Sequence, residues 1–275
     1  MAHDDLDGFA RAVEDNWCEA WMSLGRLHAQ PPTHADAPSQ FVRVWTPGVP
    51  EMLLNIVLRY RSPISVGVPE IERVIEPFRA HHLPFQWWLT RGTEPSGLRE
   101  ALRHIGMQTW GGATSMALPL AGWTSMPASL MPGTSTGTAR SAADASEALG
   151  VICRVFTVSP EPMARWTSEN PAFQLYVAKV EGRVASALAT LRRGAVVGFY
   201  HVATVAWARR RGLAGALLSH ALTEARDAGC SLATLTATPE ARHLYEQLGF
   251  RACGMIEQWI PGPDLSWQLM SGHEC

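Results

Sequence analysis

Charged residues are scarce in this sequence, and neither sign dominates. Asp, Glu, Lys and Arg together make up 17% of the 275 residues, and the formal net charge at pH 7 is −2. Proteins that bind nucleic acid extensively are usually clearly basic, because their lysines and arginines displace the counterions of the phosphates. The balance therefore argues against a nucleic-acid-binding protein, and any basic site must be local.

Cysteine is also rare and does not occur in closely spaced pairs. The odd number of five cysteines fits reduced thiols. A structural zinc site needs about four ligands in short-spaced pairs, so we expect no metal. The acidic N-terminal segment lacks the apolar core of a signal peptide, and no stretch reaches about 18 uninterrupted apolar residues. We therefore expect a cytoplasmic protein that does not enter a membrane.

The length and the composition favour two globular domains. Hydrophobic residues make up 47% of the chain, which is enough for a packed core in each half. The segment Gly122–Gly137 is dense in Gly, Pro, Ser and Thr and has no hydrophobic period, which predicts a linker over residues 122–137. The two domains are then residues 1–121 and 138–275.

The first half alternates helical and strand patterns. The prolines of Gln30–Ser39 break helical hydrogen bonding and predict a loop there. The hydrophobic spacing predicts the other elements. The helices are Leu6–Leu27, Pro69–His82 and Ser96–Ile105, and the strands are Phe41–Trp45, Phe85–Thr90 and a short one near Ser115–Leu118.

The second half has a clearer pattern. Three strand candidates follow one another with tight turns at Glu181–Gly182 and at Arg192–Gly194, which predicts an antiparallel meander. The expected strands are Gln174–Val180, Ala185–Leu191, Val196–Val205, Leu232–Ala237 and Arg251–Ile260. The expected helices are Ala142–Phe156, Pro160–Asn170, Gly212–Ala228 and Pro239–Leu248.

Three arginines followed by small residues stand between a strand and a long helix. Trp207–Leu218 reads WARRRGLAGALL. The N–H groups at a helix start have no intrahelical partner, and the helix dipole adds partial positive charge, so such a turn holds a phosphate well. Gly212, Ala214 and Gly215 carry no bulky side chain that would block a close approach. The pattern predicts a phosphate cradle, against the plainer reading of a solvated helix start.

Two motifs resemble the GNAT superfamily of N-acetyltransferases. Arg209–Ala214 matches its acetyl-CoA signature R/Q-x-x-G-x-G/A, and Thr238–Phe250, which reads TPEARHLYEQLGF, is similar to the family's N-x-x-A-x-x-L-Y-x-x-x-G-F. Trp207 and Thr238 depart from the proline and the asparagine that are common at their positions. The resemblance implies a mixed, mainly antiparallel α/β (α+β) sheet flanked by helices over residues 138–260.

The resemblance also implies direct transfer of an acetyl group from acetyl-CoA, used as a co-substrate, to the primary amine of a small molecule. Tyr245 would be the general acid that protonates the departing thiolate. The remaining family positions would bind the cofactor. The strand residues Ala203, Thr204 and Val205 would hold the pantetheine, and the other cofactor-binding residues would be Arg209, Arg210, Arg211, Gly212, Leu213, Ala214, Gly215, Thr238 and Arg242.

The general base is left open between two neighbours. The strand VVGFYHVATV carries no acid, and His201 is attractive because its usual pKa lies near neutrality. Strand alternation puts Tyr200 and His201 on opposite faces, so only one of them is expected to face the acceptor. An amine that arrives neutral, or that loses its proton to water, is the remaining alternative.

The first half faintly repeats the second. LREALRHIGM at Leu98–Met107 echoes ARHLYEQLGF, yet the first half has no R-x-x-G-x-G/A signature. We therefore expect a tandem chain, in which a degenerate domain precedes the active one, or else an unrelated α/β domain. Two other functions stay open. One is an acyl-CoA sensor without turnover, and the other is a transferase that uses another acyl donor, such as a charged tRNA.

Overall fold

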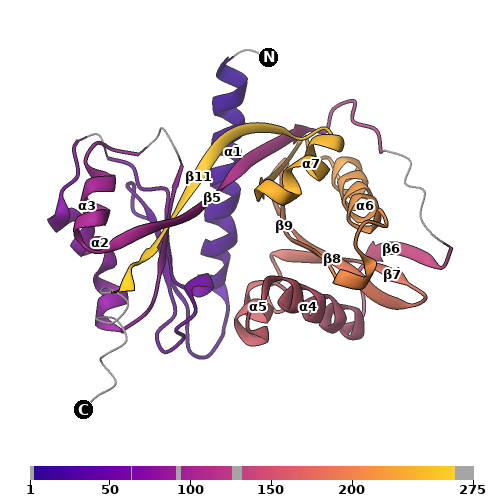
Figure 1. The fold of residues 1–275 in the computed structure, drawn as a ribbon, viewed down its shortest axis with the longest axis horizontal. Helices are drawn as coiled ribbons and strands as arrows, with labels where there is room; N and C mark the ends of the chain where they lie inside the picture. Colours follow the sequence, from indigo (N-terminus) through magenta and orange to yellow (C-terminus); the bar gives the residue numbers. More distant parts are fainter. Residues whose placement is uncertain (1–2, 63, 91–93, 126–131, 264–275) are drawn as a thin grey trace. The chain divides into compact units, whose positions relative to one another are not determined.

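The computed structural model describes residues 3–62, 64–90, 94–125 and 132–263, and these fall into two compact units (Figure 1). Unit 1 comprises residues 1–17 and 114–253, and unit 2 comprises residues 18–113 and 254–275. The expected domains are two continuous segments, residues 1–121 and 138–275, whereas each observed unit consists of two separate segments of the chain. The long helix α1 (His3–Met22) and the strands β5 (Met107–Pro119) and β11 (Arg251–Pro261) each contribute residues to both units.

The sheet of unit 1 is mainly antiparallel, as the sequence predicts. Strands β7 to β9 form the expected meander, and β6, which was not expected, extends it antiparallel to β7. Strand β10 is parallel to β9, and β5 is antiparallel to β10. Both residues of the Glu181–Gly182 turn have positive φ, which two-residue hairpins favour. The strands are β6 (Thr134–Thr138), β7 (Phe173–Val180), β8 (Arg183–Arg193), β9 (Val196–Thr204) and β10 (Leu232–Ala237).

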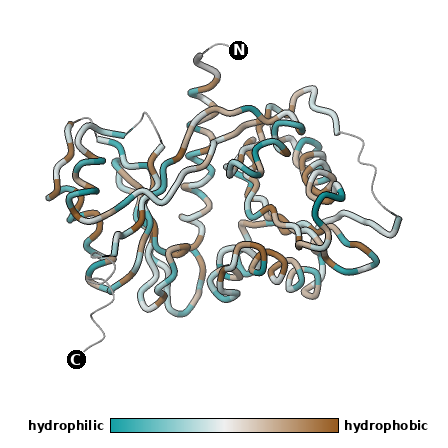
Figure 2. Tube along the Cα trace, in the orientation of Figure 1, coloured by the Kyte–Doolittle hydropathy of each residue, from teal (hydrophilic) through white to brown (hydrophobic). Residues whose placement is uncertain are grey.

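Helices cover both faces of the meander. Figure 1 shows α4 (Ala142–Phe156) and α5 (Pro160–Trp166) on one side of the strands and α6 (Leu213–Asp227) on the other. Hydrophobic and hydrophilic residues alternate along α4 and α6, so each helix buries one side (Figure 2). Helix α7 (Pro239–Gln247) follows β10.

Unit 2 contains the same kinds of pairing in a smaller sheet. The order is β1 (His34–Asp36), β2 (Val42–Trp45), β3 (Ile56–Leu58), β4 (Gln86–Thr90) and β11. The β3–β4 pair is parallel, and the other described pairs are antiparallel. Helix α2 (Val68–Ala80) connects β3 to β4, and α3 (Leu98–His104) follows β4. Their apolar sides form a core with the fully buried Trp87 and Trp259.

The two units repeat one chain order. In unit 2 the chain runs β3–α2–β4–α3 and then continues into β5, and in unit 1 it runs β9–α6–β10–α7 and then continues into β11. Residues 114–119 of β5 pair with β10 inside unit 1, while residues 256–259 of β11 pair with β4 inside unit 2. Each sheet is thus completed by a strand that follows the last helix of the other unit in sequence.

Two sequence predictions of irregular structure are wrong in part. The expected loop 30–39 contains the three-residue strand β1, which pairs with β2 and whose residues lie between the loop's prolines. The expected linker 122–137 runs into β6, where β-branched threonines alternate and pair with β7. Residues 126–131 of that linker lie outside the described residues.

Candidate functional site

A β-bulge interrupts strand β9 in the middle of unit 1. In the ladder with β8, Ala189 pairs with Tyr200 and Ala187 pairs with Ala203, so two residues of β9 lie opposite the single residue between the alanines. His201 is the first of these two and has a φ of 52°, in the left-handed region that residues other than glycine rarely adopt. The bulge reorients the end of β9, and such a conformation persists only where its surroundings hold it.

Strand β9 continues beyond its pairing with β10. The parallel register covers three pairs and ends at Gly198 and Thr234, whereas β9 runs on to Thr204 and β10 to Ala237. The N–H of Val205 still donates to the carbonyl of Ala185 on β8, at 3.0 Å. Because successive residues of a strand turn their backbone groups to opposite edges, Thr204 presents its own on the edge away from β8.

The prediction that Tyr200 and His201 face opposite sides is wrong. Both rings contact the indole of Trp166, with centroid distances of 5.3 Å for Tyr200 and 4.5 Å for His201. The bulge begins between these two residues and breaks the alternation on which the prediction depends. Phe173 adds a further ring to this aromatic cluster, 5.4 Å from Tyr200 and 4.8 Å from Trp166.

The imidazole of His201 is shielded from water on one side. Its Nε2 is buried and has no hydrogen-bond partner among the described residues. Burial lowers the pKa of His201 to about 4, because removal from water disfavours the imidazolium. The ring is therefore neutral at pH 7 and is a weak base. The ring of Phe156, a residue that is 44% exposed, lies with its centroid 5.7 Å from that of the imidazole.

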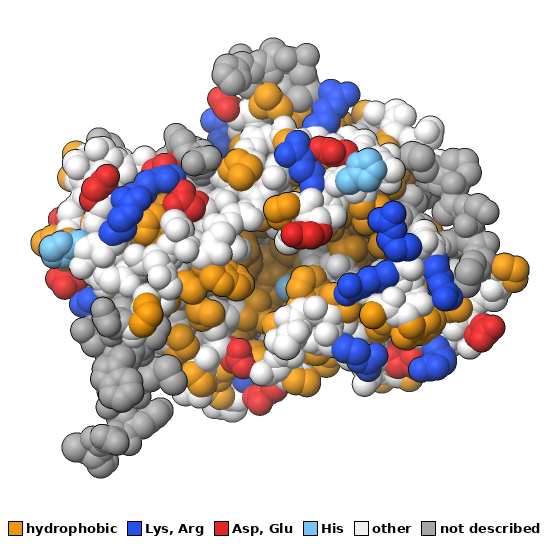
Figure 3. Space-filling view, viewed as in Figure 1, with side chains coloured by type: hydrophobic (Ala, Val, Ile, Leu, Met, Phe, Trp, Pro, Cys, Tyr) orange, Lys and Arg blue, Asp and Glu red, His pale blue; other side chains and the backbone are white. Residues whose placement is uncertain are grey.

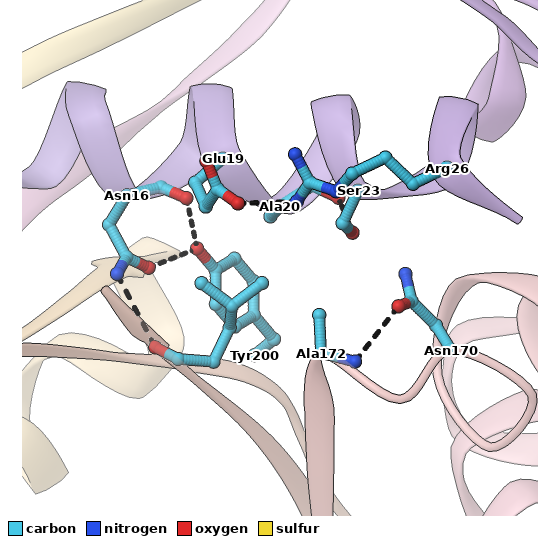
Figure 4. A network of polar contacts seen from close by, with 9 residues as sticks. Asn16, Glu19, Ala20, Ser23, Arg26, Asn170, Ala172 and Tyr200 are labelled. Atoms are coloured by element: carbon cyan, nitrogen blue, oxygen red, sulfur yellow. Dashed lines mark hydrogen bonds and ion pairs between the residues drawn. The ribbon is translucent and has the colours of Figure 1, made fainter. Parts of the chain in front are cut away.

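The hydroxyl of Tyr200 is held by the N-terminal helix. It donates to Oδ1 of Asn16 at 2.5 Å and also lies 3.1 Å from the backbone oxygen of Asn16 (Figure 4). The side-chain amide of Asn16, which is 1% exposed, donates from Nδ2 to the carbonyl of Leu191 on β8 at 3.3 Å. Residue 16 thus connects to both strands at the start of the bulge.

The sequence gives little indication of this connection, because 184 residues separate Asn16 from Tyr200. A glycine in the middle of a strand was the one available signal, since it often marks a close backbone approach. A Cβ built on Gly198 would overlap Oδ1 of Asn16 and would lie 2.8 Å from Cε2 of Tyr200. The glycine therefore makes room for the asparagine side chain.

The predicted cradle forms a turn with two left-handed residues. Arg210 has a φ of 62° and Gly212, the N-cap of α6, has a φ of 76°. The N–H of Ala216 bonds to the carbonyl of Gly212 at 3.0 Å, so the preceding N–H groups of the first turn have no intrahelical partner. The first turn of α6 carries no acidic residue, and a Cβ at Gly212 would meet nothing within 4 Å. The turn is therefore open to an anion.

The three arginines of the turn are exposed. Nε of Arg209 donates to the carbonyl of Thr204 at 3.1 Å, which ties the turn to the end of β9. Among the described residues, no carboxylate forms an ion pair with Arg209, Arg210 or Arg211. Figure 3 shows Lys and Arg side chains gathered on the side of the view where Figure 1 places α4, α6 and β8.

Tyr245 lies on α7 and is buried. Its ring contacts Phe250 at 6.0 Å, and Phe250 contacts Phe199 at 6.4 Å, so two aromatic contacts lead from Tyr245 to the residue before Tyr200. Burial raises the pKa of Tyr245 to about 12. The phenol therefore keeps its proton throughout the physiological range.

Two other predicted cofactor residues already have partners. Glu240 accepts a backbone hydrogen bond and a second one from the Thr238 hydroxyl, and the two lower the pKa of its carboxyl. Nε of Arg242 donates to Glu246 at 2.7 Å, one helical turn further along α7. Both residues are exposed, so a ligand would compete with these contacts.

The helix start at the equivalent place in unit 2 is built differently. The N-cap of α2 is Gly67, whose N–H donates to the carboxylate of Glu70 at 3.0 Å. Pro69 in the first turn removes a further N–H donor. An acidic side chain therefore occupies the place where α6 would receive an anion.

One protein family matches the second half of the chain. Residues 142–259 match the family described as acetyltransferase (GNAT) domain. The protein carries a GNAT acetyltransferase domain. The match covers the strand–turn–helix of the cradle and helix α7 with Tyr245, so the domain is an acyltransferase domain, and acetyl-CoA is the co-substrate of its family. No curated protein matches the sequence.

Solved structures extend the likeness to most of the chain. A GCN5-related N-acetyltransferase from Kribbella flavida is 18% identical with a TM-score of 0.66, over 90% of this chain and 97% of that one. One from Sphaerobacter thermophilus is also 18% identical, with a TM-score of 0.58 and 84% of each chain covered. A fungal glucosamine N-acetyltransferase region reaches a TM-score of 0.56 at 13% identity, over 94% of this chain and 37% of that one. These likenesses confirm the predicted fold class.

Two other kinds of feature are missing from the described part of the chain. No group of three or more His, Cys, Asp or Glu side chains is placed to hold a metal ion. None of the helices described here has both the length and the apolar composition that a membrane span requires.

Proposed function

We propose that this protein transfers an acetyl group from acetyl-CoA to the primary amine of a small molecule. One observation carries the proposal. The open helix start at Gly212 follows directly on a bulged strand whose end has no partner in β10. A phosphate group and an extended arm of one ligand would therefore find adjoining sites.

Two parts of the backbone would bind two parts of acetyl-CoA. The N–H groups of Arg210 to Gly215 would bind the pyrophosphate, with the exposed arginines at the rim. The pantetheine would pair with the free edge of β9 as an added strand does. Of the three residues assigned to this role, Thr204 has its backbone groups on that edge, whereas the N–H of Val205 bonds to β8 and the carbonyl of Ala203 accepts from Ser186 at 2.7 Å.

Tyr245 is proposed as the general acid. With a pKa of about 12 it is fully protonated at pH 7 and can donate to the departing thiolate. An exposed thiol has a pKa near 8.5, which would make the proton transfer unfavourable. A coenzyme thiolate shielded from water would be a stronger base than an exposed one, because burial disfavours its charged form. Shielding of the sulfur would therefore bring its pKa closer to that of Tyr245.

His201 is too weak a base to remove a proton from an ammonium ion in the ground state. A primary ammonium with a pKa near 10.4 would lose its proton uphill by about 6 units, or roughly 9 kcal/mol, to an imidazole of pKa about 4. The amine is therefore proposed to enter as the free base. His201 or water then takes a proton only after attack, when the nitrogen has become acidic.

The acceptor would lie beside four aromatic side chains that are not fully buried. They are Tyr200, His201, Phe156 and Phe173. Aromatic faces favour an acceptor with an apolar or cationic body. The fold is that of a fungal glucosamine N-acetyltransferase region, which is one case of a small amine on this architecture. Unit 2 is proposed to be a degenerate copy that holds no donor, because Glu70 closes its helix start.

The proposal is tested by the products. The full-length protein is incubated with acetyl-CoA and a panel of aliphatic, aromatic and amino-sugar amines, and free CoA and N-acetylated product are measured together. Equal amounts of both support the transferase. Acetyl-CoA binding without turnover of any amine would favour the acyl-CoA sensor. A protein that does not bind acetyl-CoA would contradict both the transferase and the sensor.

A further inference from the structure

We infer that Asn16 is a positioning residue of the transferase, which fixes the bulge of β9 through Tyr200 so that the free end of the strand can receive the pantetheine. The inference rests on the proposed function. Residues 1–17 belong to unit 1, together with every strand that Asn16 contacts.

The orientation of the Asn16 amide follows from its contacts. A backbone carbonyl only accepts hydrogen bonds, so the group that faces the Leu191 carbonyl at 3.3 Å must be the NH₂ group. Oδ1 then points to Tyr200, and the phenol must be the donor in the 2.5 Å bond (Figure 4). The amide is thus satisfied at both ends, and it is buried, so its position is well determined.

The contacts of Asn16 with Leu191 and Tyr200 lie two residues apart along the β8–β9 ladder. Leu191 of β8 pairs with Gly198 of β9, and Gly198 is also the last residue of β9 that pairs with β10. Tyr200 is the last residue of β9 before the bulge, and His201 follows in its left-handed conformation. Asn16 therefore connects β8 and β9 at the point where β9 leaves β10 and bends.

Tyr200 is restrained at both ends. Trp166 and Phe173 pack against its ring, and Asn16 holds its hydroxyl. A residue that is fixed in this way limits the backbone of its neighbour, and a left-handed histidine needs such restraint. Loss of the hydroxyl contact would let the bulge relax and would misalign the edge of Thr204, which would receive the pantetheine. The helix start at Gly212 lies eight residues beyond Thr204. The backbone bond from Ala216 to Gly212 holds it, and one side-chain bond, from Arg209 to the Thr204 carbonyl, joins it to the end of β9.

The experiment compares two ligands. Dissociation constants are measured by calorimetry for acetyl-CoA and for its nucleotide half, 3′-phosphoadenosine 5′-diphosphate, with the full-length wild type, Asn16→Ala, Tyr200→Phe and the double variant. Gly198→Ala, whose new methyl group would displace the Asn16 side chain, is a third route to the same break. Gly150→Ala on α4 is the matched control, because a Cβ there meets nothing within 4 Å and its φ is ordinary.

Each single variant is expected to weaken acetyl-CoA binding about 10-fold, as the loss of one well-placed hydrogen bond would. The double variant should lose no more acetyl-CoA affinity than either single variant, since Asn16→Ala and Tyr200→Phe remove the same contact. Binding of the nucleotide half should change less than twofold. Where the same assay gives turnover, kcat should fall as well, because the acyl carbonyl would be misplaced.

Three results overturn the inference. Acetyl-CoA affinity that is unchanged in Tyr200→Phe contradicts it even if Asn16→Ala fails to fold. An equal loss for both ligands indicates general destabilisation, and additive losses in the double variant indicate separate roles. A wild type that binds no acetyl-CoA contradicts the proposed function itself and is distinguishable from each of these.

Discussion

Tyr200 and His201 are consecutive residues of one strand, yet both place their rings against the same indole, that of Trp166. A regular strand would separate them to opposite faces. The bulge that begins after Tyr200 gathers the phenol and the imidazole beside Trp166, beyond the point where β9 stops pairing with its parallel neighbour β10. His201 therefore has both the left-handed backbone of the bulge and the imidazole whose pKa burial lowers.

The buried imidazole predicts a pH-dependent stability. The pKa of His201 is about 4 in the folded protein and near 6.5 in the unfolded chain, so the unfolded state binds the proton first as pH falls. This contribution to stability is complete above pH 6.5 and is lost progressively between about pH 6.5 and pH 4. Its size is on the order of 3 kcal/mol.

Urea unfolding at pH 7.5 and at pH 5 measures the effect. His201→Asn, which cannot be protonated in this range, should lose less stability than the wild type between the two pH values. His243 is exposed on α7, and the matched variant His243→Asn should behave like the wild type. An identical pH dependence in all three proteins would contradict the account of His201.

The rate of transfer should follow the ionisation of the amine. If the amine enters as the free base, kcat/KM rises tenfold per pH unit from about pH 6 up to the pKa of the amine. His201 adds no inflection near pH 6.5, because its pKa lies at about 4. The pH profile for an acceptor of known pKa checks this. A plateau that begins near pH 6.5 would instead assign the limiting proton transfer to a histidine of ordinary pKa.

Removal of the Tyr245 hydroxyl should affect chemistry and not binding. Tyr245→Phe keeps the ring contact with Phe250 and is expected to lower kcat about 100-fold with little change in acetyl-CoA affinity. Tyr60→Phe removes another buried phenol and serves as the control. Steady-state kinetics distinguish the two variants. An unchanged kcat in Tyr245→Phe would leave the residue as a packing side chain.

Substitution of the three exposed arginines distinguishes acetyl-CoA from a charged tRNA as the acyl donor. Simultaneous Arg→Gln changes at 209, 210 and 211 should weaken acetyl-CoA several-fold, more at low than at high salt. The protein should bind a short RNA only weakly at 150 mM salt, because its net charge is −2. Tight RNA binding that the triple variant abolishes would favour the tRNA-dependent alternative. Fluorescence anisotropy at two salt concentrations decides between them.

The sequence predicts local structure well where one rule governs it. Helix Ala142–Phe156 and strand Leu232–Ala237 have the expected bounds, because periodicity and turn residues mark both ends. The tight turn at Glu181–Gly182 and the C-terminal stop of α6 at Gly229, with a φ of 86°, follow from glycine. The arginine–glycine turn likewise lies where the motif places it, at the start of α6.

Features that depend on distant parts of the chain could not be predicted. The alternation rule fails at His201 because the bulge is defined by a partner strand. The expected boundary near residue 121 fails to describe the packing, because β5 and β11 each run into the sheet of the unit that does not hold their preceding helix. Asn16 was missed for the same reason, since nothing in its own neighbourhood indicates a contact with Tyr200.

The central claim is that the helix start at Gly212 binds the pyrophosphate of acetyl-CoA, and a calorimetric titration of acetyl-CoA tests it most directly. Gly212→Glu would place a carboxylate and a strained φ in the cradle, and Gly212→Ala would add the strain alone. Gly150→Glu adds the same charge on exposed α4 without strain. The account predicts micromolar binding by the wild type and by Gly150→Glu, with at least a roughly tenfold loss in Gly212→Glu. Equal affinity in Gly212→Glu and the wild type would contradict it.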